Sequence, residues 1–112
     1  MSMIDEYVGY LLTNLAESHS KWSQETFGSD EIKGPLGSIL HLQKEINELL
    51  ENPKDIKEYA DVLLLTLDAS RRAGFDIVTL LEATSEKLQE NKTRKWNLLN
   101  RKNIDEPVEH QK

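Results

Sequence analysis

From residue 36 to residue 73 the chain reads LGSILHLQKEINELLENPKDIKEYADVLLLTLDASRRA, and this stretch decides the fold. Its apolar residues recur every three or four positions on both sides of Asn52-Pro53, the spacing of one face of an α-helix. Asn is a common N-cap and Pro is tolerated at the first helical position, so the pair ends one helix and begins another. The stretch predicts helices over 36–51 and 53–73, which a short break allows to pack antiparallel as a hairpin.

A further helix is predicted before this hairpin. Ser2 and Asp5 have the spacing of a capping box, and apolar residues follow at helical intervals, which indicates a helix over about residues 3–19. Residues 22–35 contain two glycines and Pro35, so they are predicted to form a long loop.

A fourth helix is predicted after the hairpin. Gly74 is placed to end the third helix, and Asp76 to cap a fourth that runs to about Asn100. The remainder has Pro107 and mixed charge, which is typical of a frayed end. The expected fold is an all-α, four-helix bundle, with residues 1–100 as a single domain and 101–112 as a flexible C-terminal tail.

Composition narrows the class of protein. The chain has 112 residues, of which 38% are hydrophobic and 30% charged, which suits one soluble domain. The modest hydrophobic share favours a homo-oligomer that buries helix faces between copies. The chain has no cysteine, which excludes a thiolate zinc site, and no signal-peptide pattern opens it. These features lead us to expect a cytoplasmic protein.

The net charge and the apolar runs exclude two kinds of partner. A net charge of −6 argues against binding a nucleic acid polymer, which requires a basic surface. It allows a nucleotide ligand, because bound metal supplies positive charge. The longest apolar run, over residues 62–67, is too short to span a membrane.

An acidic stripe runs along the predicted third helix. At 100° per residue its members fall within an arc of about 80°: Glu58, Asp61, Leu65, Asp68 and Arg72. The rest of that helix is so apolar that we expect it to be largely buried. Buried carboxylates are costly unless they are paired or bound to metal. Asp68 and Arg72 are spaced for a structural salt bridge, which leaves Glu58 and Asp61 as candidate metal ligands.

A second acidic pair lies on the preceding helix. Glu45 and Glu48 share a side, and antiparallel packing would bring them opposite Glu58 and Asp61. Four oxygen ligands favour Mg²⁺ or Mn²⁺ over zinc. Either pair alone also suits a solvated helix face. His41, one turn before Glu45, is expected at the helix surface or beside the ligands.

Two other groups of residues are candidates for substrate binding. Lys87, Asn91 and Arg94 fall within an arc of about 60° and have the chemistry to grip phosphate oxygens. A solvated basic face near a helix C-terminus is the alternative. Trp22 and Phe27, in or beside the predicted loop, are placed either to cover a nucleobase or to join the core.

These motifs, in this order, resemble the all-α NTP pyrophosphohydrolase (MazG-like) superfamily. The run GPLGSILHLQKEINELLENPKDIKEYADVLLLTLDASRRAGF is similar to its phage and bacterial subgroup of dATP/dGTP diphosphohydrolases (MazZ-like). The segment WSQETFG from Trp22 resembles the Trp-containing stretch ahead of the metal helices. The likeness covers about residues 22–96. Lys44 departs from the superfamily pattern, because a second glutamate often stands there.

The resemblance implies a reaction and an assembly. A deoxynucleoside triphosphate, of the purine type dGTP or dATP, would give the monophosphate and pyrophosphate. Two or three Mg²⁺ ions, or Mn²⁺, would be bound by Glu45, Glu48, Glu58 and Asp61, with Glu48 orienting or deprotonating the water. Lys87, Asn91, Arg94 and Trp22 would bind substrate. A homodimer or homotetramer is implied, because family members complete their sites with a neighbouring subunit, and a phage protein would act in the host cytoplasm.

Three alternatives stay open. The same chemistry would serve dUTP, dCTP or phosphoribosyl-ATP, since base choice depends on pocket shape. The chain would otherwise be a non-enzymatic helical interaction module that dimerises through Leu63, Leu64 and Leu67. The third alternative is a divalent-metal-binding helical protein without hydrolytic activity.

Overall fold

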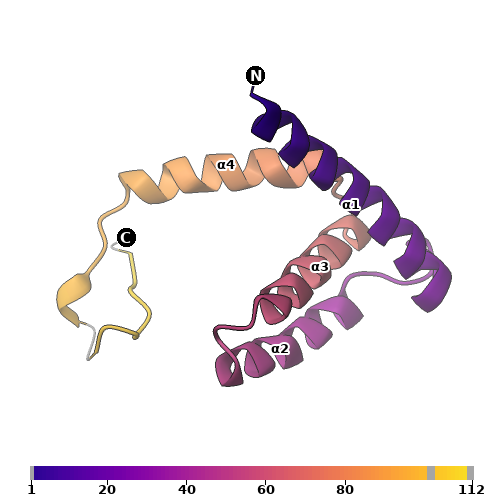
Figure 1. Ribbon diagram of the computed structural model, residues 1–112. Helices are drawn as coiled ribbons and strands as arrows, with labels where there is room; N and C mark the ends of the chain where they lie inside the picture. The colour runs from indigo at the N-terminus through magenta and orange to yellow at the C-terminus, as the bar shows by residue number, and fades with distance from the viewer. Residues whose placement is uncertain (1, 101–102, 111–112) are drawn as a thin grey trace. The chain divides into compact units, whose positions relative to one another are not determined.

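The structure is a computed structural model that describes residues 2–100 and 103–110. Its elements are α1 (Met3–Phe27), α2 (Leu36–Glu51), α3 (Ile56–Arg72), α4 (Ile77–Thr93) and a 3₁₀ turn, Leu98–Asn100 (Figure 1). The described residues form no β-strand, and one isolated bridge joins Trp96 to His110. The expected all-α, four-helix class is confirmed.

The chain divides into two compact units, Met1–Leu80 and Leu81–Lys112. The first contains α1, α2, α3 and the first residues of α4. The second contains the rest of α4 and the C-terminal segment. Among the described residues, no helix combines the length and the apolar character that crossing a membrane requires.

The central hairpin forms as predicted, except for its turn. Figure 1 shows α2 and α3 side by side, and α2 has the predicted bounds. Asn52 caps the C-terminal end of α2, and its backbone N–H donates to the Glu48 carbonyl at 3.0 Å. Asp55 caps α3, since its side chain accepts from the Lys57 N–H at 3.0 Å. The prediction that Asn52 caps α3 with Pro53 as its first residue is therefore wrong: an Asp three residues later offers the cap.

The predicted end of α3 is confirmed as a Schellman motif. Gly74 has φ 103°, and its N–H donates to the Arg71 carbonyl at 2.9 Å. The Phe75 N–H donates to the Ser70 carbonyl at 3.0 Å. Asp76 then caps α4 as predicted, because its Oδ1 accepts from the Thr79 N–H at 2.8 Å.

The fourth helix is shorter than predicted. It ends at Thr93 and not near Asn100. The backbone of Asn97 instead donates to the Glu109 carbonyl at 3.0 Å, and the Trp96 indole donates to the Asn91 carbonyl at 3.0 Å. These bonds replace helical ones. In the predicted flexible tail, residues 101, 102, 111 and 112 lie outside the described residues, and the flexibility of 101–112 stays a prediction.

The first helix is longer than predicted. The Ser2–Asp5 capping box is confirmed, but α1 runs to Phe27 and not to residue 19, so the loop shrinks to 28–35. Gly28 ends α1 with φ 120°, and its N–H donates to the Gln24 carbonyl at 3.1 Å. The last turns carry no apolar periodicity. They are helical because Ser23 is buried against α3.

The interior of the first unit is unusually polar. Leu67 is the one buried hydrophobic side chain in the described part of the chain. The other buried residues are Ser23, Ser38, Glu45, Asp68 and Arg72. In this single chain α3 is buried towards its C-terminal end, and Leu63 is 49% exposed, so the prediction of a largely buried α3 is wrong. The predicted Asp68–Arg72 salt bridge is confirmed, with Nε and Oδ2 3.1 Å apart.

Candidate metal centre

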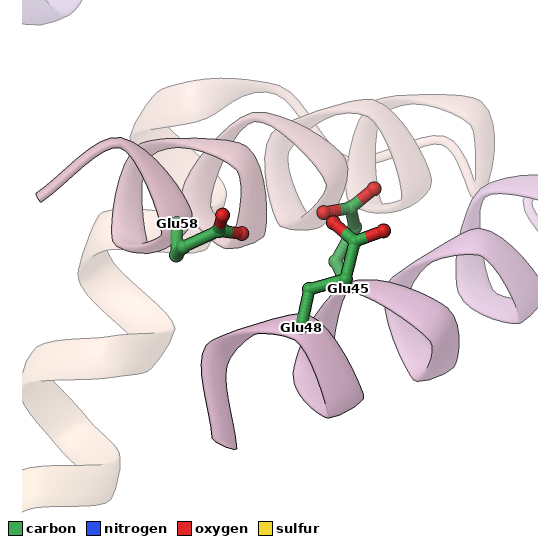
Figure 2. A group of neighbouring side chains, drawn as sticks. All are labelled: Glu45, Glu48 and Glu58. Carbon is green, nitrogen blue, oxygen red and sulfur yellow. The ribbon is translucent and has the colours of Figure 1, made fainter. Parts of the chain in front are cut away.

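Three glutamates from two helices meet at the hairpin. Glu45 and Glu48 come from α2, and Glu58 comes from α3. Each offers a carboxylate oxygen, and these oxygens lie within 4.8 Å of one another. Figure 2 shows the two α2 side chains close together and the Glu58 carboxylate directed towards them. The structure thus brings together three of the four predicted metal ligands.

The fourth predicted ligand, Asp61, lies beside this group without belonging to it. It stands one turn after Glu58 on α3 and lines a cavity together with Glu45. Its charge raises the pKa of both Glu45 and Glu58, which places it within electrostatic reach. Asp61 therefore borders the three-glutamate group on the α3 side.

The carboxylates perturb one another. The pKa of Glu45 is raised, first by a hydrogen bond shared with the Glu48 carboxyl, then by burial and by the charges of Glu48 and Asp61. The pKa of Glu58 is raised, first by burial and then by neighbouring acidic charges, Glu48 foremost. Without a counter-ion the site prefers to keep protons, which is the electrostatic state of a cation-binding group.

Two oxygens of this group lack a partner. With the carboxylates ionised, Glu45 Oε2 and Glu58 Oε2 are buried and have no hydrogen-bond partner among the described residues. A buried carboxylate oxygen is costly in that state unless a cation binds it. The donors are all carboxylates, which suits a hard divalent cation such as Mg²⁺ or Mn²⁺. The residues present therefore fit the predicted metal.

His41 lies beside the group, as predicted. Its Nε2 is 3.1 Å from Glu45 Oε1, one turn along α2, and its side chain is 55% exposed. A protonated His41 lowers the pKa of Glu45, against the acidic neighbours. It occupies a position from which it orients one ligand oxygen.

An aromatic cavity adjoins the acidic residues. It has a volume of about 180 Å³, and Glu45 and Asp61 line it together with His19, Trp22 and Phe27. The Trp22 ring lies 5.5 Å from Phe27 edge-on and 5.9 Å from His19. Trp22 and Phe27 lie on the last turns of α1 and not in a loop, which corrects their predicted setting.

His19 was missed by the sequence analysis, although it stands one turn before Trp22 on the same helix. Its Nδ1 is buried and has no hydrogen-bond partner in the described part of the chain, and burial is the first cause that lowers its pKa. The spacing of His19 and Trp22 would have placed them on the same face of a helix, but only if the helix had been predicted to extend past residue 19.

A larger cavity lies away from the acidic group. Its volume is about 620 Å³, and it is lined mainly by α1 and the C-terminal end of α3, with His19, Leu67, Arg71 and Phe75 among its residues. None of the predicted metal ligands lines it. The smaller aromatic cavity, which touches Glu45 and Asp61, is the one that matters for chemistry at the carboxylates.

The predicted phosphate-binding residues belong to the second unit. Lys87 Nζ lies 3.5 Å from Glu90 Oε2, and Arg94 pairs with the other oxygen of the same carboxylate. Arg94 also donates to Asn91 Oδ1 at 3.4 Å. The three side chains thus form one local group at the C-terminal end of α4, with Arg94 just after the helix. Their action at the carboxylates stays a prediction.

Comparison with known proteins agrees with this chemistry. A family model for dATP/dGTP pyrophosphohydrolases matches residues 15–112, which include every predicted site residue. The chain belongs to the dATP/dGTP pyrophosphohydrolase family. The resemblance stated from the paired acidic motifs is confirmed.

Two curated phage proteins are similar in sequence to this chain. The chain is 42% identical over 82 residues to the Eaa protein of Salmonella phage P22, an alignment covering 73% of this chain and 25% of that protein. It is 40% identical over 81 residues to a dATP/dGTP diphosphohydrolase of Salmonella phage PMBT28, which covers 71% of this chain and 26% of the relative. The chain spans about a quarter of the length of these relatives.

A solved structure of another phage protein has the same fold. It is the MazG-like pyrophosphohydrolase of cyanophage S-2L, bound to dGDP and three catalytic Mn²⁺ ions per active site. The TM-score is 0.69 at 29% identity, and the match covers 90% of this chain and 97% of that one. The family fold therefore extends over most of the chain.

Proposed function

We propose that this family member hydrolyses purine deoxynucleoside triphosphates, dGTP and dATP, to the monophosphate and pyrophosphate in the presence of Mg²⁺ or Mn²⁺. The observation that carries the proposal is the group of Glu45, Glu48 and Glu58, whose carboxylate oxygens lie within 4.8 Å of one another. Two oxygens of this group are buried and have no hydrogen-bond partner among the described residues. The family match and the dGDP and Mn²⁺ of the cyanophage protein support the substrate class and the metal.

The acidic residues have distinct roles in this proposal. Glu45, Glu48, Glu58 and Asp61 bind two or three divalent cations, which supply charge neutralisation at the phosphates and a water of lowered pKa. Glu48 is half-buried and has a carboxylate oxygen within 4.8 Å of those of Glu45 and Glu58, so it is placed to orient the attacking water and to accept its proton.

The substrate contacts come from two other groups. Lys87, Asn91 and Arg94 bind the outer phosphates, and Glu90, which pairs with both Lys87 and Arg94, holds the two cations near one another at the end of α4. Trp22 covers the base in the aromatic cavity that adjoins Glu45. An aromatic face accepts any base, so the purine preference rests on the family and not on Trp22.

We further propose that the chain works as a homodimer or homotetramer. Apolar side chains of α1 are solvent-exposed in the single chain: Met3 87%, Ile4 74%, Tyr7 61%, Val8 48% and Leu11 44%. An apolar stripe of this kind is a surface that association covers. Sedimentation at several protein concentrations tests this, and a monomer throughout would contradict it. The phage origin of the relatives supports action in the host cytoplasm.

A substrate panel tests the proposed function. The purified chain is incubated with each canonical dNTP, with dUTP and with phosphoribosyl-ATP, in Mg²⁺ or in Mn²⁺, and pyrophosphate is assayed. We expect release from dGTP and dATP. Equal release from dUTP or dCTP would shift the substrate within the same chemistry. No release from any nucleotide would leave a metal-binding or interaction module.

A further inference from the structure

A buried polar cluster joins the three helices of the first unit. At its centre is Asp68 of α3, which is 5% exposed. Ser23 of α1 donates from Oγ to Asp68 Oδ1 at 2.6 Å, and Ser38 of α2 donates from Oγ to Oδ2 at 2.5 Å. The two serines are 1% and 4% exposed. One carboxylate therefore binds both neighbouring helices, in a unit with little apolar core.

Two arginines complete the cluster. Arg71 Nη2 donates to Asp68 Oδ1 at 2.8 Å, and Arg72 Nε donates to Oδ2 at 3.1 Å, so each oxygen accepts one hydroxyl and one guanidinium group. Burial alone would raise the pKa of Asp68, but these four bonds hold it well below its usual range. Arg72 also donates to the carbonyls of Gly28 and Lys33 at 2.9 and 3.3 Å. The loop before α2 is thereby attached to α3.

The bond between Ser38 and Asp68 is well placed to set the register of the hairpin. Ser38 stands two turns before Glu45 on α2, and Asp68 stands two turns after Asp61 on α3. Because the helices are antiparallel, the bond and the facing carboxylates lie at two levels about 10 Å apart along the hairpin. Slippage by one residue moves a helix about 1.5 Å along its axis, which would break the bond and separate the carboxylates.

Other contacts of α2 define this register poorly. Its N-cap, Pro35, makes no side-chain capping bond, so the first turn of α2 has no local anchor of that kind. Leu42 and Leu49 are half-buried, and four other apolar residues are 40% or more exposed: Ile39, Leu40, Ile46 and Leu50. Partly exposed aliphatic contacts are non-directional and tolerate sliding, whereas a buried charge-assisted hydrogen bond does not.

We propose that Ser38 and Asp68 are positioning residues, which fix the axial register of α2 against α3 and so hold the carboxylates of the two helices within reach of one cation group. The inference rests on the proposed function, which assigns cation binding to those carboxylates. Metal sites require ligands within about 0.5 Å of their productive positions, so a small slip of α2 weakens the site without unfolding the helices.

A matched pair of variants separates this role from general stability. Ser38→Ala and Ser23→Ala each remove one hydroxyl bond to the same buried carboxylate, but Ser38 lies on a helix that carries metal ligands and Ser23 does not. Mn²⁺ affinity is measured without nucleotide, from the electron paramagnetic resonance signal of free Mn²⁺. Urea unfolding of both variants is measured in parallel.

The expected result is a split between the two readouts. Both variants lose stability, Ser23→Ala the more because Ser23 Oγ also accepts from Arg72 Nη2 at 2.9 Å. Ser38→Ala nevertheless weakens Mn²⁺ binding about tenfold, as outer residues of metal sites do, and Ser23→Ala leaves it near that of the unsubstituted chain. Equal Mn²⁺ affinities in the two variants would overturn the proposal. If Ser38→Ala does not fold, Ser38→Cys keeps a weaker donor of similar size, and Mn²⁺ affinity unchanged in that variant overturns it instead.

Failure of the proposed function gives a different pattern. Pyrophosphate release by the unsubstituted chain is assayed beside the Mn²⁺ titrations. No release, together with the split in Mn²⁺ affinity, would contradict the proposed reaction and support the positioning role. An unsubstituted chain that binds no Mn²⁺ would contradict both.

Discussion

Glu45 on α2 and Glu58 on α3 bring carboxylate oxygens within 4.8 Å of each other, and each has one buried oxygen that no described residue hydrogen-bonds. The pKa of Glu45 is raised first by its hydrogen bond with Glu48 and that of Glu58 first by burial, and the charges of Glu48 and Asp61 raise both. Ionised carboxylates in this group therefore repel one another, and binding of a divalent cation would offset that repulsion. The role of these carboxylates as metal ligands can therefore be tested by removing a charge, by changing the pH and by adding metal.

Glu58→Gln should abolish turnover and leave the bundle folded. The substitution removes one ligand and one repelling charge while keeping the size of the side chain, so we expect metal affinity to fall at least tenfold. The metal-free variant should unfold at the same or a higher temperature than the unsubstituted chain. Pyrophosphate assays, Mn²⁺ titration and circular dichroism measure the three effects.

Asp61→Asn should behave in the same way, and Glu6→Gln is the control. Glu6 is exposed on the first turn of α1 and precedes the segment that the family model matches. Full activity in both Glu58→Gln and Asp61→Asn would contradict the metal assignment.

The contribution of Glu45 and Glu58 to the stability of the metal-free chain should grow as the pH falls towards 5. The folded chain binds protons at Glu45 and Glu58 more tightly than the unfolded chain does. The resulting stability is fully present below the ordinary pKa of 4.5 and is lost as the pH rises through the raised values. Asp68 and His19 have lowered pKa values and act in the opposite direction. The contribution of Asp68 is lost only below its ordinary pKa of 3.8, whereas that of His19 falls as the pH drops below its ordinary pKa of 6.5.

Saturating Mn²⁺ should reverse this trend. A cation binds the ionised carboxylates, so its stabilisation grows as the pH rises and vanishes where protons occupy the site. Thermal unfolding with chelator and with Mn²⁺, from about pH 5 to 8, measures both curves. Parallel curves in the two conditions would show that these glutamates do not bind the cation.

Lys87→Ala should raise the KM for dGTP more than tenfold with a smaller effect on kcat, because it removes a charge that contacts the outer phosphates. Lys92→Ala is the matched control, since Lys92 is an exposed lysine about 140° further round α4. Steady-state kinetics at low ionic strength compare the two. Equal effects would indicate that α4 acts through its net charge alone.

Trp22→Ala should raise the KM for dGTP, because base stacking on an aromatic side chain contributes about 1–3 kcal/mol. Trp22→Phe keeps an aromatic face against Phe27 and should retain most of the affinity. Mn²⁺ titration checks that the carboxylates are intact in both variants. A KM unchanged in Trp22→Ala would place the base elsewhere.

Asp68→Asn should destabilise the chain by up to about 3–5 kcal/mol, because it leaves Arg71 and Arg72 with the partly exposed Asp30 as their remaining counter-charge. That is a large share of the total stability of about 5–15 kcal/mol that a domain has. Asp30→Asn is the graded control: Asp30 is 30% exposed and pairs with Arg71 at 3.0 Å, so its loss should cost about 1 kcal/mol. Urea unfolding measures both, and equal losses would contradict the central role of Asp68.

Much of the fold was predictable from local signals. The periodic apolar residues of 36–51 predict α2 with its observed bounds, and Gly74 with Asp76 marks the junction of α3 and α4. The ends of α1 and α4 were not predictable in this way. The final turns of α1 depend on Ser23, whose partner Asp68 is 45 residues away, and α4 stops where Asn97 pairs with Glu109. Local patterns do not contain such partners.

The features of the candidate site likewise fall into those that local sequence predicts and those that tertiary contacts determine. The sequence by itself determined that Glu45, Glu48 and Glu58 lie on one hairpin, because helical periodicity and a short turn dictate which side chains share a face. Tertiary structure alone decided which of their oxygens are buried, that Asp61 borders the group, and that the buried Asp68 bonds to both neighbouring helices. These features depend on desolvation and on distances between residues far apart in the chain, which no local pattern encodes.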